Sequence, residues 1–191
     1  MIEFNDYINE AKLKLNDKEE DVLLLWGGTK YTKLAKLEKS KKFDNPKLKL
    51  FYQVLDKLPK YKGNAFRGIS KIPLKVAEDY AKQKTITFGV TSSASTSKKL
   101  ASNFIRIDPN KEEYGILFII KCKTAANYFK CEYAQPTLKK EKEVILRRES
   151  KYKVTKVKIV PFKTHPMGFG GKRTTKSSKT AKIYEIEMTE V

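Results

Sequence analysis

The chain of 191 residues is 40% hydrophobic and 33% charged, which allows one buried core and makes a single domain over 1–191 the expected organisation. Two cysteines are too few for a disulfide framework, and the start of the sequence does not resemble a secretory signal. No apolar run approaches the ~20 residues that span a bilayer. We therefore expect a cytoplasmic protein and not a secreted or membrane protein. The formal net charge of +19 favours polyanions or acidic protein surfaces as partners.

The first part of the chain, residues 1–62, is predicted to be mainly helical because its apolar residues recur at helical spacing. The segment Pro59–Gly63 is predicted to break the chain before the next region. The expected helices are one over Phe4–Leu15, one capped by Asp17 that ends at Gly27-Gly28, one over Tyr31–Leu37, and one that begins at Asn45-Pro46.

Residues 63–191 change to short apolar runs rich in β-branched and aromatic residues, which are typical of strands. Two short helical patterns interrupt them, near Val76–Lys82 and Lys98–Phe104. Helices followed by strands indicate an α+β fold and not a doubly wound sheet. The predicted strands are Ala65–Ile69, Thr85–Val90, Tyr114–Lys121, Glu143–Leu146, Tyr152–Val160 and Ile183–Met188. A bulge is expected after Val154, and a loop over Pro161–Thr180 is expected to join the last two strands.

The glycines do not form a dinucleotide fingerprint. Gly168-Phe169-Gly170-Gly171 lacks both the required spacing and the strand–turn–helix context. Metal chemistry is not expected either, because Cys122, Cys131 and the single His165 fall short of the four ligands of a structural zinc site. We expect both cysteines to be ordinary thiols.

Two polar motifs lie on predicted strands. Arg67, followed by Gly68, offers a rigid fork of donors that suits phosphate oxygens, and the glycine lets a flat ring approach the backbone. Ser93 and Ser95 are two residues apart, so on a strand their hydroxyls point the same way and could bind a ribose or steady a carboxylate. An exposed arginine in a turn and a plain Ser/Thr-rich loop are the alternatives.

A third motif is a pair of glutamates, Glu141 and Glu143, where an apolar strand begins. Such a pair can divide two tasks, one stabilising positive charge on a sugar and the other handling a proton. Glu185 and Glu187 repeat the spacing, but they alternate with apolar residues as on the solvent face of a strand, so we expect them to be structural.

In this order, the three motifs resemble the R-S-E class of mono-ADP-ribosyltransferases, and in particular the small Mod-type enzymes of T-even bacteriophages. The resemblance extends from Phe66 to about Val154 and includes the form Ser93-Ala94-Ser95 and the block Glu141–Leu146. It implies an ADP-ribosyltransferase-like fold, in which N-terminal helices precede a mixed β core of two packed sheets. The β-rich catalytic core would then be residues 63–191.

The resemblance implies NAD⁺ as substrate and no metal. Arg67 would hold the NAD⁺ phosphates, and Gly68 would bind the nicotinamide amide through its backbone. Ser93 would orient the catalytic glutamate, with Ser95 supporting the same pocket. Glu143 would bind the nicotinamide ribose and stabilise its positive charge as nicotinamide leaves.

By the same resemblance, Glu141 would engage an acceptor arginine, and residues 103–115 would cover nicotinamide, with Phe104 expected in the core. The expected acceptor is an arginine on an intracellular protein, in host transcription or translation if the enzyme comes from a phage and acts in the host cytoplasm. A virion-delivered or secreted effector that lacks a signal peptide is the alternative origin.

The positive charge keeps two other functions open. One is an ADP-ribosyltransferase that acts on nucleic acid or uses NAD-capped RNA as donor. The other is a basic nucleic-acid-binding protein without catalysis, which would need aromatic residues interleaved with basic ones. Residues 147–182 hold twelve Lys or Arg and one acid, Glu149, but few such pairs.

Overall fold

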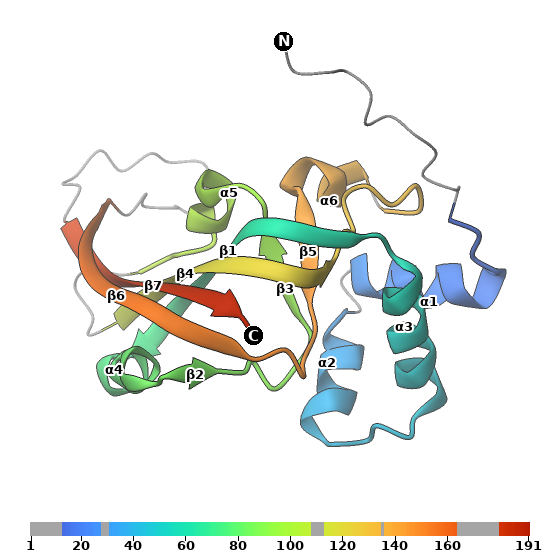
Figure 1. Ribbon diagram of the computed structural model, residues 1–191, viewed down its shortest axis with the longest axis horizontal. Coiled ribbons are helices and arrows are strands. Elements are labelled where there is room, and N and C mark those ends of the chain that lie inside the picture. The colour runs from blue at the N-terminus through green and yellow to red at the C-terminus, as the bar shows by residue number, and fades with distance from the viewer. Residues whose placement is uncertain (1–12, 28–30, 108–112, 135, 164–179) are drawn as a thin grey trace, which may run out of the picture.

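Figure 1 shows the computed structural model of the chain, which describes residues 13–27, 31–107, 113–134, 136–163 and 180–191. Three helices lie together at one side of the molecule: α1 (Asp17–Gly27), α2 (Tyr31–Lys39) and α3 (Pro46–Lys57). Strands make up most of the remainder, so the predicted α+β class is confirmed. The helix predicted over Phe4–Leu15 lies mostly outside the described residues.

The starts of α1 and α3 are set by asparagine side chains. Asn16, and not Asp17 as predicted, caps α1: its side-chain oxygen accepts from the backbone N–H of Glu19 at 3.1 Å, and the Glu19 carboxylate accepts from the Asn16 N–H at 3.2 Å. This reciprocal capping box satisfies two donors that a helix start would leave unpaired. Asn45 caps α3 by accepting from the Lys47 N–H, as expected where proline occupies the first helical position.

The buried faces of α1–α3 form a core that extends into the strands. Trp26 stacks on Phe51 with ring centroids 5.2 Å apart. The strand region contributes Ala126, Tyr128 and Ile145 to the same cluster, so the helices are packed against the β region and are not a separate layer.

The strands are β1 (Lys60–Pro73), β2 (Thr85–Ile86), β3 (Ser92–Ser95), β4 (Glu113–Ala126), β5 (Glu143–Leu146), β6 (Tyr152–Lys163) and β7 (Thr180–Glu190). They hydrogen bond in the order β1-β3-β5-β4-β7-β6-β2, with a further pairing of β1 and β4. The β4–β7 pair is parallel and the other pairs are antiparallel, so the sheet is mixed as predicted.

The short pair β3–β5 forms a second layer against the long strands. Within the described chain, β3 pairs with β1 at one position, Phe66–Ser95, and β5 pairs with β4 at one position, Ala126–Ile145. In Figure 1 the pair accordingly crosses the long strands at a steep angle. Apolar residues from both layers share one core, which includes Ala94, Val144 and Leu146 from the short pair and Ile116, Phe118 and Ile186 from the long strands.

Three short helices connect the strands: α4 (Leu74–Lys82), α5 (Lys98–Asn103) and α6 (Pro136–Glu141). The first two match the predicted helical patterns, whereas α6 was not predicted. The bulge in β6 is confirmed by the register shift between Val154 and Lys156.

Three expected sets of boundaries are wrong. Residues 59–63 do not separate the helices from the strands, because β1 begins at Lys60. Gly63, with φ of +150°, lies inside β1 at a register shift. The strand predicted over Thr85–Val90 ends at Ile86, because Gly89, with φ of +69°, turns the chain toward β3. The strands β6 and β7 also extend into both ends of the predicted loop 161–180, of which residues 164–179 lie outside the described chain.

Cys122 and Cys131 are both free and buried. Burial raises the pKa of the Cys122 thiol to about 12. Among the described residues, no helix is long and apolar enough to span a membrane.

Candidate active site

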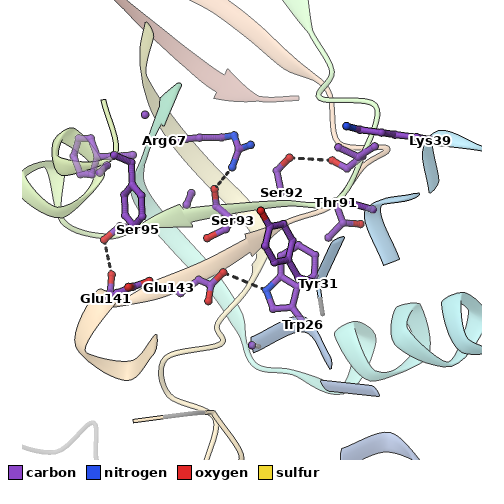
Figure 2. Close-up of a pocket in the computed structure, with 18 residues that line it drawn as sticks. Trp26, Tyr31, Lys39, Arg67, Thr91, Ser92, Ser93, Ser95, Glu141 and Glu143 are labelled. Atoms are coloured by element: carbon purple, nitrogen blue, oxygen red, sulfur yellow. Dashed lines mark hydrogen bonds between the residues drawn. The ribbon is translucent and has the colours of Figure 1, made fainter. Parts of the chain in front are cut away.

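A cavity of about 630 Å³ lies where β1, β3 and β5 meet α1, α2 and α5. Figure 2 shows that charged and hydroxyl side chains from these elements converge on it. Each candidate residue from the sequence lines this cavity: Arg67, Gly68, Ser93, Ser95, Glu141 and Glu143. Three segments that are far apart in the sequence are thus brought together.

Arg67 lies on β1 with its guanidinium held by two contacts. Its NH1 donates to the carbonyl oxygen of Ser93 at 2.5 Å, and its Cζ lies 5.5 Å from the centroid of the Phe88 ring. Its Nε is buried and has no hydrogen-bond partner among the described residues. Burial lowers the pKa of Arg67 from its ordinary value. A fixed guanidinium with an unused donor suits an incoming phosphate oxygen.

Gly68, the next residue on β1, has a packing reason to be glycine. A Cβ at this position would lie 2.4 Å from the carbonyl oxygen of Ala101 and 2.8 Å from Cγ1 of Ile105. The glycine therefore lets α5 approach β1. Beyond the Phe66–Ser95 pair, the edge of β1 that faces β3 has no further ladder in the described residues, which leaves this backbone accessible from the cavity.

Ser93 and Ser95 lie on β3, opposite β5, but their hydroxyls differ in use. Ser95 pairs with Glu143 in the strand register and is buried. Its hydroxyl donates to the carbonyl oxygen of Glu141 at 2.7 Å and accepts from the N–H of Ser97 at 3.0 Å. Ser95 thus fixes the backbone beside the two glutamates, whereas Ser93 is exposed and its hydroxyl faces the cavity (Figure 2).

Glu143 begins β5 and is only 5% exposed. Its Oε1 accepts from the indole N–H of Trp26 at 3.2 Å, and its Oε2 is buried without a hydrogen-bond partner among the described residues. Burial raises the pKa of this carboxyl more than the Ser93 hydroxyl and the Trp26 N–H lower it. The Glu141 carboxylate raises the pKa further, and Arg67 counteracts it. Trp26 thus holds one carboxyl oxygen in place, and the other has no hydrogen-bond partner of good geometry in the described part of the chain.

Glu141 is the last residue of α6 and is half-buried at the cavity wall. Lys142, with φ of +51°, separates it from Glu143 and turns the chain from the helix into the strand. The pair is therefore asymmetric: Glu143 lies inside the cavity, and Glu141 lies nearer to solvent, where a second substrate could approach.

Sequence reasoning missed the contribution of the N-terminal helices. Trp26 and Gly27 from α1, and Tyr31, Ala35 and Lys39 from α2, also line the cavity. The helical spacing of the sequence indicates only that these five residues belong to helices. The one available signal was that Trp26 is the only tryptophan, since a buried indole N–H requires an acceptor.

Phe104 corrects one expectation. It was expected in the core but is 53% exposed and lines the cavity, because α5 ends at Asn103 and the chain turns there. Its carbonyl oxygen accepts from the Ser70 hydroxyl, which in turn accepts from the Arg106 N–H at 2.7 Å. These bonds fasten the start of the segment 103–115 to β1, while residues 108–112 lie outside the described chain.

The rival pair Glu185 and Glu187 lies on β7 and does not line the cavity. Glu185 pairs with Lys98 at 2.7 Å and Glu187 with Lys158 at 3.7 Å. In the described part of the chain, no group of three or more His, Cys, Asp or Glu residues could hold a metal ion. His165 lies outside that part.

The fold is similar to that of bacterial toxins of known structure. One is Vis toxin, an ADP-ribosyltransferase from Vibrio splendidus, with a TM-score of 0.60 and 18% identity over 92% of this chain and 74% of the toxin. The complex of Vis with agmatine has a TM-score of 0.64. C2-I, the enzymatic component of the C2 toxin of Clostridium botulinum, has a TM-score of 0.58 at 15% identity over 93% of this chain and 44% of C2-I. Exoenzyme S from Pseudomonas aeruginosa, in complex with human 14-3-3 protein beta and bound to Carba-NAD, has a TM-score of 0.55 at 13% identity over 90% of this chain and 74% of the exoenzyme.

The chain therefore has the ADP-ribosyltransferase fold, as expected. It spans less than half the length of C2-I. No protein-family model matches the chain, and no curated protein matches it in sequence.

Proposed function

We propose that this chain, as one domain over residues 1–191, is an NAD⁺-dependent mono-ADP-ribosyltransferase that modifies arginine side chains of intracellular proteins. The observation that carries this proposal is the convergence of Arg67, Ser93 and Glu143 from three strands on one cavity, with Oε2 of Glu143 buried and without a hydrogen-bond partner among the described residues. The fold shared with the toxins, one of which is bound to Carba-NAD, supports it.

In this proposal NAD⁺ is a substrate, and each part of it meets a residue of suitable chemistry. Arg67 binds the phosphates through its guanidinium, whose Nε has no hydrogen-bond partner in the described part of the chain. The open backbone edge at Gly68 binds the nicotinamide amide. Ser93 and Ser95 keep β3 and the Glu143 carboxylate in position.

The reaction breaks the bond between nicotinamide and the ribose, and the bonding electrons leave with nicotinamide. Positive charge develops on the ribose, next to the carboxylate of Glu143. A preoriented carboxylate in a site of low dielectric stabilises such a charge far more than water does. The raised pKa of Glu143 follows from the same burial that makes its charge effective.

Glu141 determines the acceptor in this proposal. A guanidinium is a poor nucleophile because it stays protonated, so a carboxylate must position it and accept a proton as it attacks. Glu141 lies nearer to solvent than Glu143 and can meet an arginine on another protein. The complex of Vis toxin with agmatine, a guanidinium compound, supports an acceptor of this class.

The biological setting follows from the resemblance to phage Mod-type enzymes. We place the target among host transcription or translation proteins in the cytoplasm. The net charge of +19 fits a target in an acidic or nucleic-acid-containing assembly.

The same charge favours one second candidate, an ADP-ribosyltransferase whose acceptor is nucleic acid or whose donor is NAD-capped RNA. Along β6, Lys153, Lys156 and Lys158 are exposed. Incubating the enzyme with labelled NAD⁺ and host lysate separates the two candidates. Label that resists nuclease and is released by hydroxylamine supports arginine modification, and label that is lost with nuclease supports nucleic acid.

The sharpest test of the proposal is a comparison of three glutamate variants by nicotinamide release and label incorporation. Glu143→Gln should lower both about 10²-fold or more, because every turnover requires nicotinamide to leave. Glu141→Gln should abolish transfer to arginine and retain NAD⁺ hydrolysis, because water needs less help than a guanidinium.

Glu185→Gln is the matched control, because it removes a carboxylate that pairs with Lys98 outside the cavity and should leave both readouts near wild type. If the variants at 141 and 143 behave alike, or if the variant at 185 gives the split, the proposed roles are wrong.

A further inference from the structure

Trp26 and Glu143 form a hydrogen bond between residues 117 positions apart in the chain. Trp26 lies in the last turn of α1, and Glu143 is the first residue of β5. This hydrogen bond links the helical region to the carboxylate at the centre of the cavity (Figure 2).

The direction of the Trp26 N–H is set by packing within the helical region. The indole is 6% exposed and stacks on Phe51 of α3, with an interplanar angle of 20° and centroids 5.2 Å apart. The ring of Tyr31 meets it edge-on at 6.5 Å. An indole clamped in this way can rotate little, so its N–H is a preoriented donor.

We propose that Trp26 is a positioning residue, which holds Oε1 of Glu143 and thereby orients Oε2, which has no hydrogen-bond partner among the described residues, for the substrate. This inference rests on the proposed function in its last step, whereas the link between Trp26 and Glu143 can be tested without NAD⁺. It makes the N-terminal helices part of the catalytic machinery and not only a scaffold.

The groups that face the Glu143 carboxylate come from four parts of the chain. They are Trp26 from α1, Arg67 from β1, Ser93 from β3 and Glu141 at the end of α6. The indole N–H is a neutral donor, so it stabilises the charged carboxylate without introducing a charge that would compete for NAD⁺ phosphates. Its removal should therefore act through the ionisation of Glu143.

Trp26→Phe removes the N–H and keeps an aromatic ring against Phe51. We expect kcat for nicotinamide release to fall about tenfold with KM for NAD⁺ nearly unchanged. The acid limb of the kcat profile should move to higher pH by about one unit, because the charged carboxylate loses a donor. In the Glu143→Gln background, the same substitution should cost little more, since the two residues act as one unit.

Leu23→Ala is the matched control for lost stability. Leu23 is fully buried in α1 and does not line the cavity, so its truncation weakens the same helical core and leaves the indole N–H in place. The folded fraction of this variant should keep the wild-type acid limb. A wild-type pH profile in Trp26→Phe, or an equal shift in Leu23→Ala, would overturn the inference.

Because Trp26 is the only tryptophan, its fluorescence reports on the link directly. The emission should titrate with pH over the range of the acid limb, and Glu143→Gln should abolish that titration. This readout needs no turnover. If the protein does not consume NAD⁺ but the titration depends on Glu143, the proposed function fails and the link stands; if the titration persists in Glu143→Gln, the link itself is wrong.

Discussion

Glu143 and Glu190 are buried to the same extent, 5% exposed each, yet their surroundings differ completely. Glu190, at the end of β7, accepts hydrogen bonds from the N–H groups of Lys123 and Thr124, from the Thr124 hydroxyl and from the Ser150 hydroxyl. Glu143 accepts one from Trp26 and is near the Ser93 hydroxyl, which also lowers its pKa, but its Oε2 has no hydrogen-bond partner of good geometry in the described residues. Burial raises the pKa of both carboxyls, but the hydrogen bonds reverse the shift at Glu190 and lower its pKa, whereas the pKa of Glu143 stays raised.

Because the two carboxylates differ in their hydrogen bonds and not in their burial, burial alone does not distinguish a structural carboxylate from a reactive one. A buried acceptor with its lone pairs occupied stabilises the fold, and one left unpaired costs free energy. Glu38 supports this distinction beside the cavity, since its partner Thr91 lines the cavity and Glu38 does not. It is 2% exposed and accepts from the N–H and hydroxyl of Thr91 and from the hydroxyl of Tyr52, so it connects α2 to the start of β3.

The largest effect on substrate binding is expected at Arg67, whose Nε has no hydrogen-bond partner among the described residues. Arg67→Lys keeps the charge but loses the planar fork, so the apparent affinity for NAD⁺ should fall about 10- to 100-fold. Binding measured by calorimetry would check this. Arg147→Lys is the control, because that guanidinium pairs with Asp56 and lies outside the cavity. Equal affinity in the wild type and the variant at 67 would remove Arg67 from the site.

Glu190→Gln should lower stability with little effect on chemistry. The loss of charge-assisted hydrogen bonds should cost about 2 kcal/mol, which corresponds to a fall in Tm of about 4–8 °C. Because the folded-state pKa is lowered, this contribution is present above the unfolded pKa and is lost as the pH falls through the folded one. The Tm gap between wild type and variant should therefore close in acid, and a gap that is constant with pH would contradict the structural role.

On stability, Glu143→Gln should have the smallest effect, with a sign opposite to that of Glu190→Gln. It removes a buried charge, so the variant should be more stable by about 1 kcal/mol, or about 2–4 °C in Tm. Because the folded-state pKa is raised, the destabilising contribution of Glu143 grows as the pH rises through the carboxyl range. The gain should be full at neutral pH and absent in acid. A less stable variant at neutral pH would mean that the carboxylate is better satisfied than its contacts indicate.

The fold could be predicted from the sequence where a local rule determines the element. Helical spacing and the Asn45-Pro46 start located α3, and apolar runs located β4, β5 and β7. Local rules failed where tertiary pairing decided the outcome. β1 starts at Lys60 because β4 provides a partner for it, although its glycine suggested a break.

For the candidate site, the sequence pointed to the strand residues but not to the helical ones. Arg67, Ser93 and Glu143 belong to short motifs with a known order, and they line one cavity; their roles remain predictions. Trp26 could not be assigned because its acceptor is 117 residues away and no local pattern specifies that contact. Phe104 was misjudged because its helix ends one residue before it.

The most direct test of the account is the rate of nicotinamide release from NAD⁺ by Glu143→Gln and Glu190→Gln, measured side by side and divided by the folded fraction of each. The account predicts a loss of about 10²-fold or more for the first variant, and a rate within about twofold of wild type for the second. Comparable losses in both variants, or an active Glu143→Gln, would contradict the claim that Glu143 performs the chemistry and Glu190 stabilises the fold.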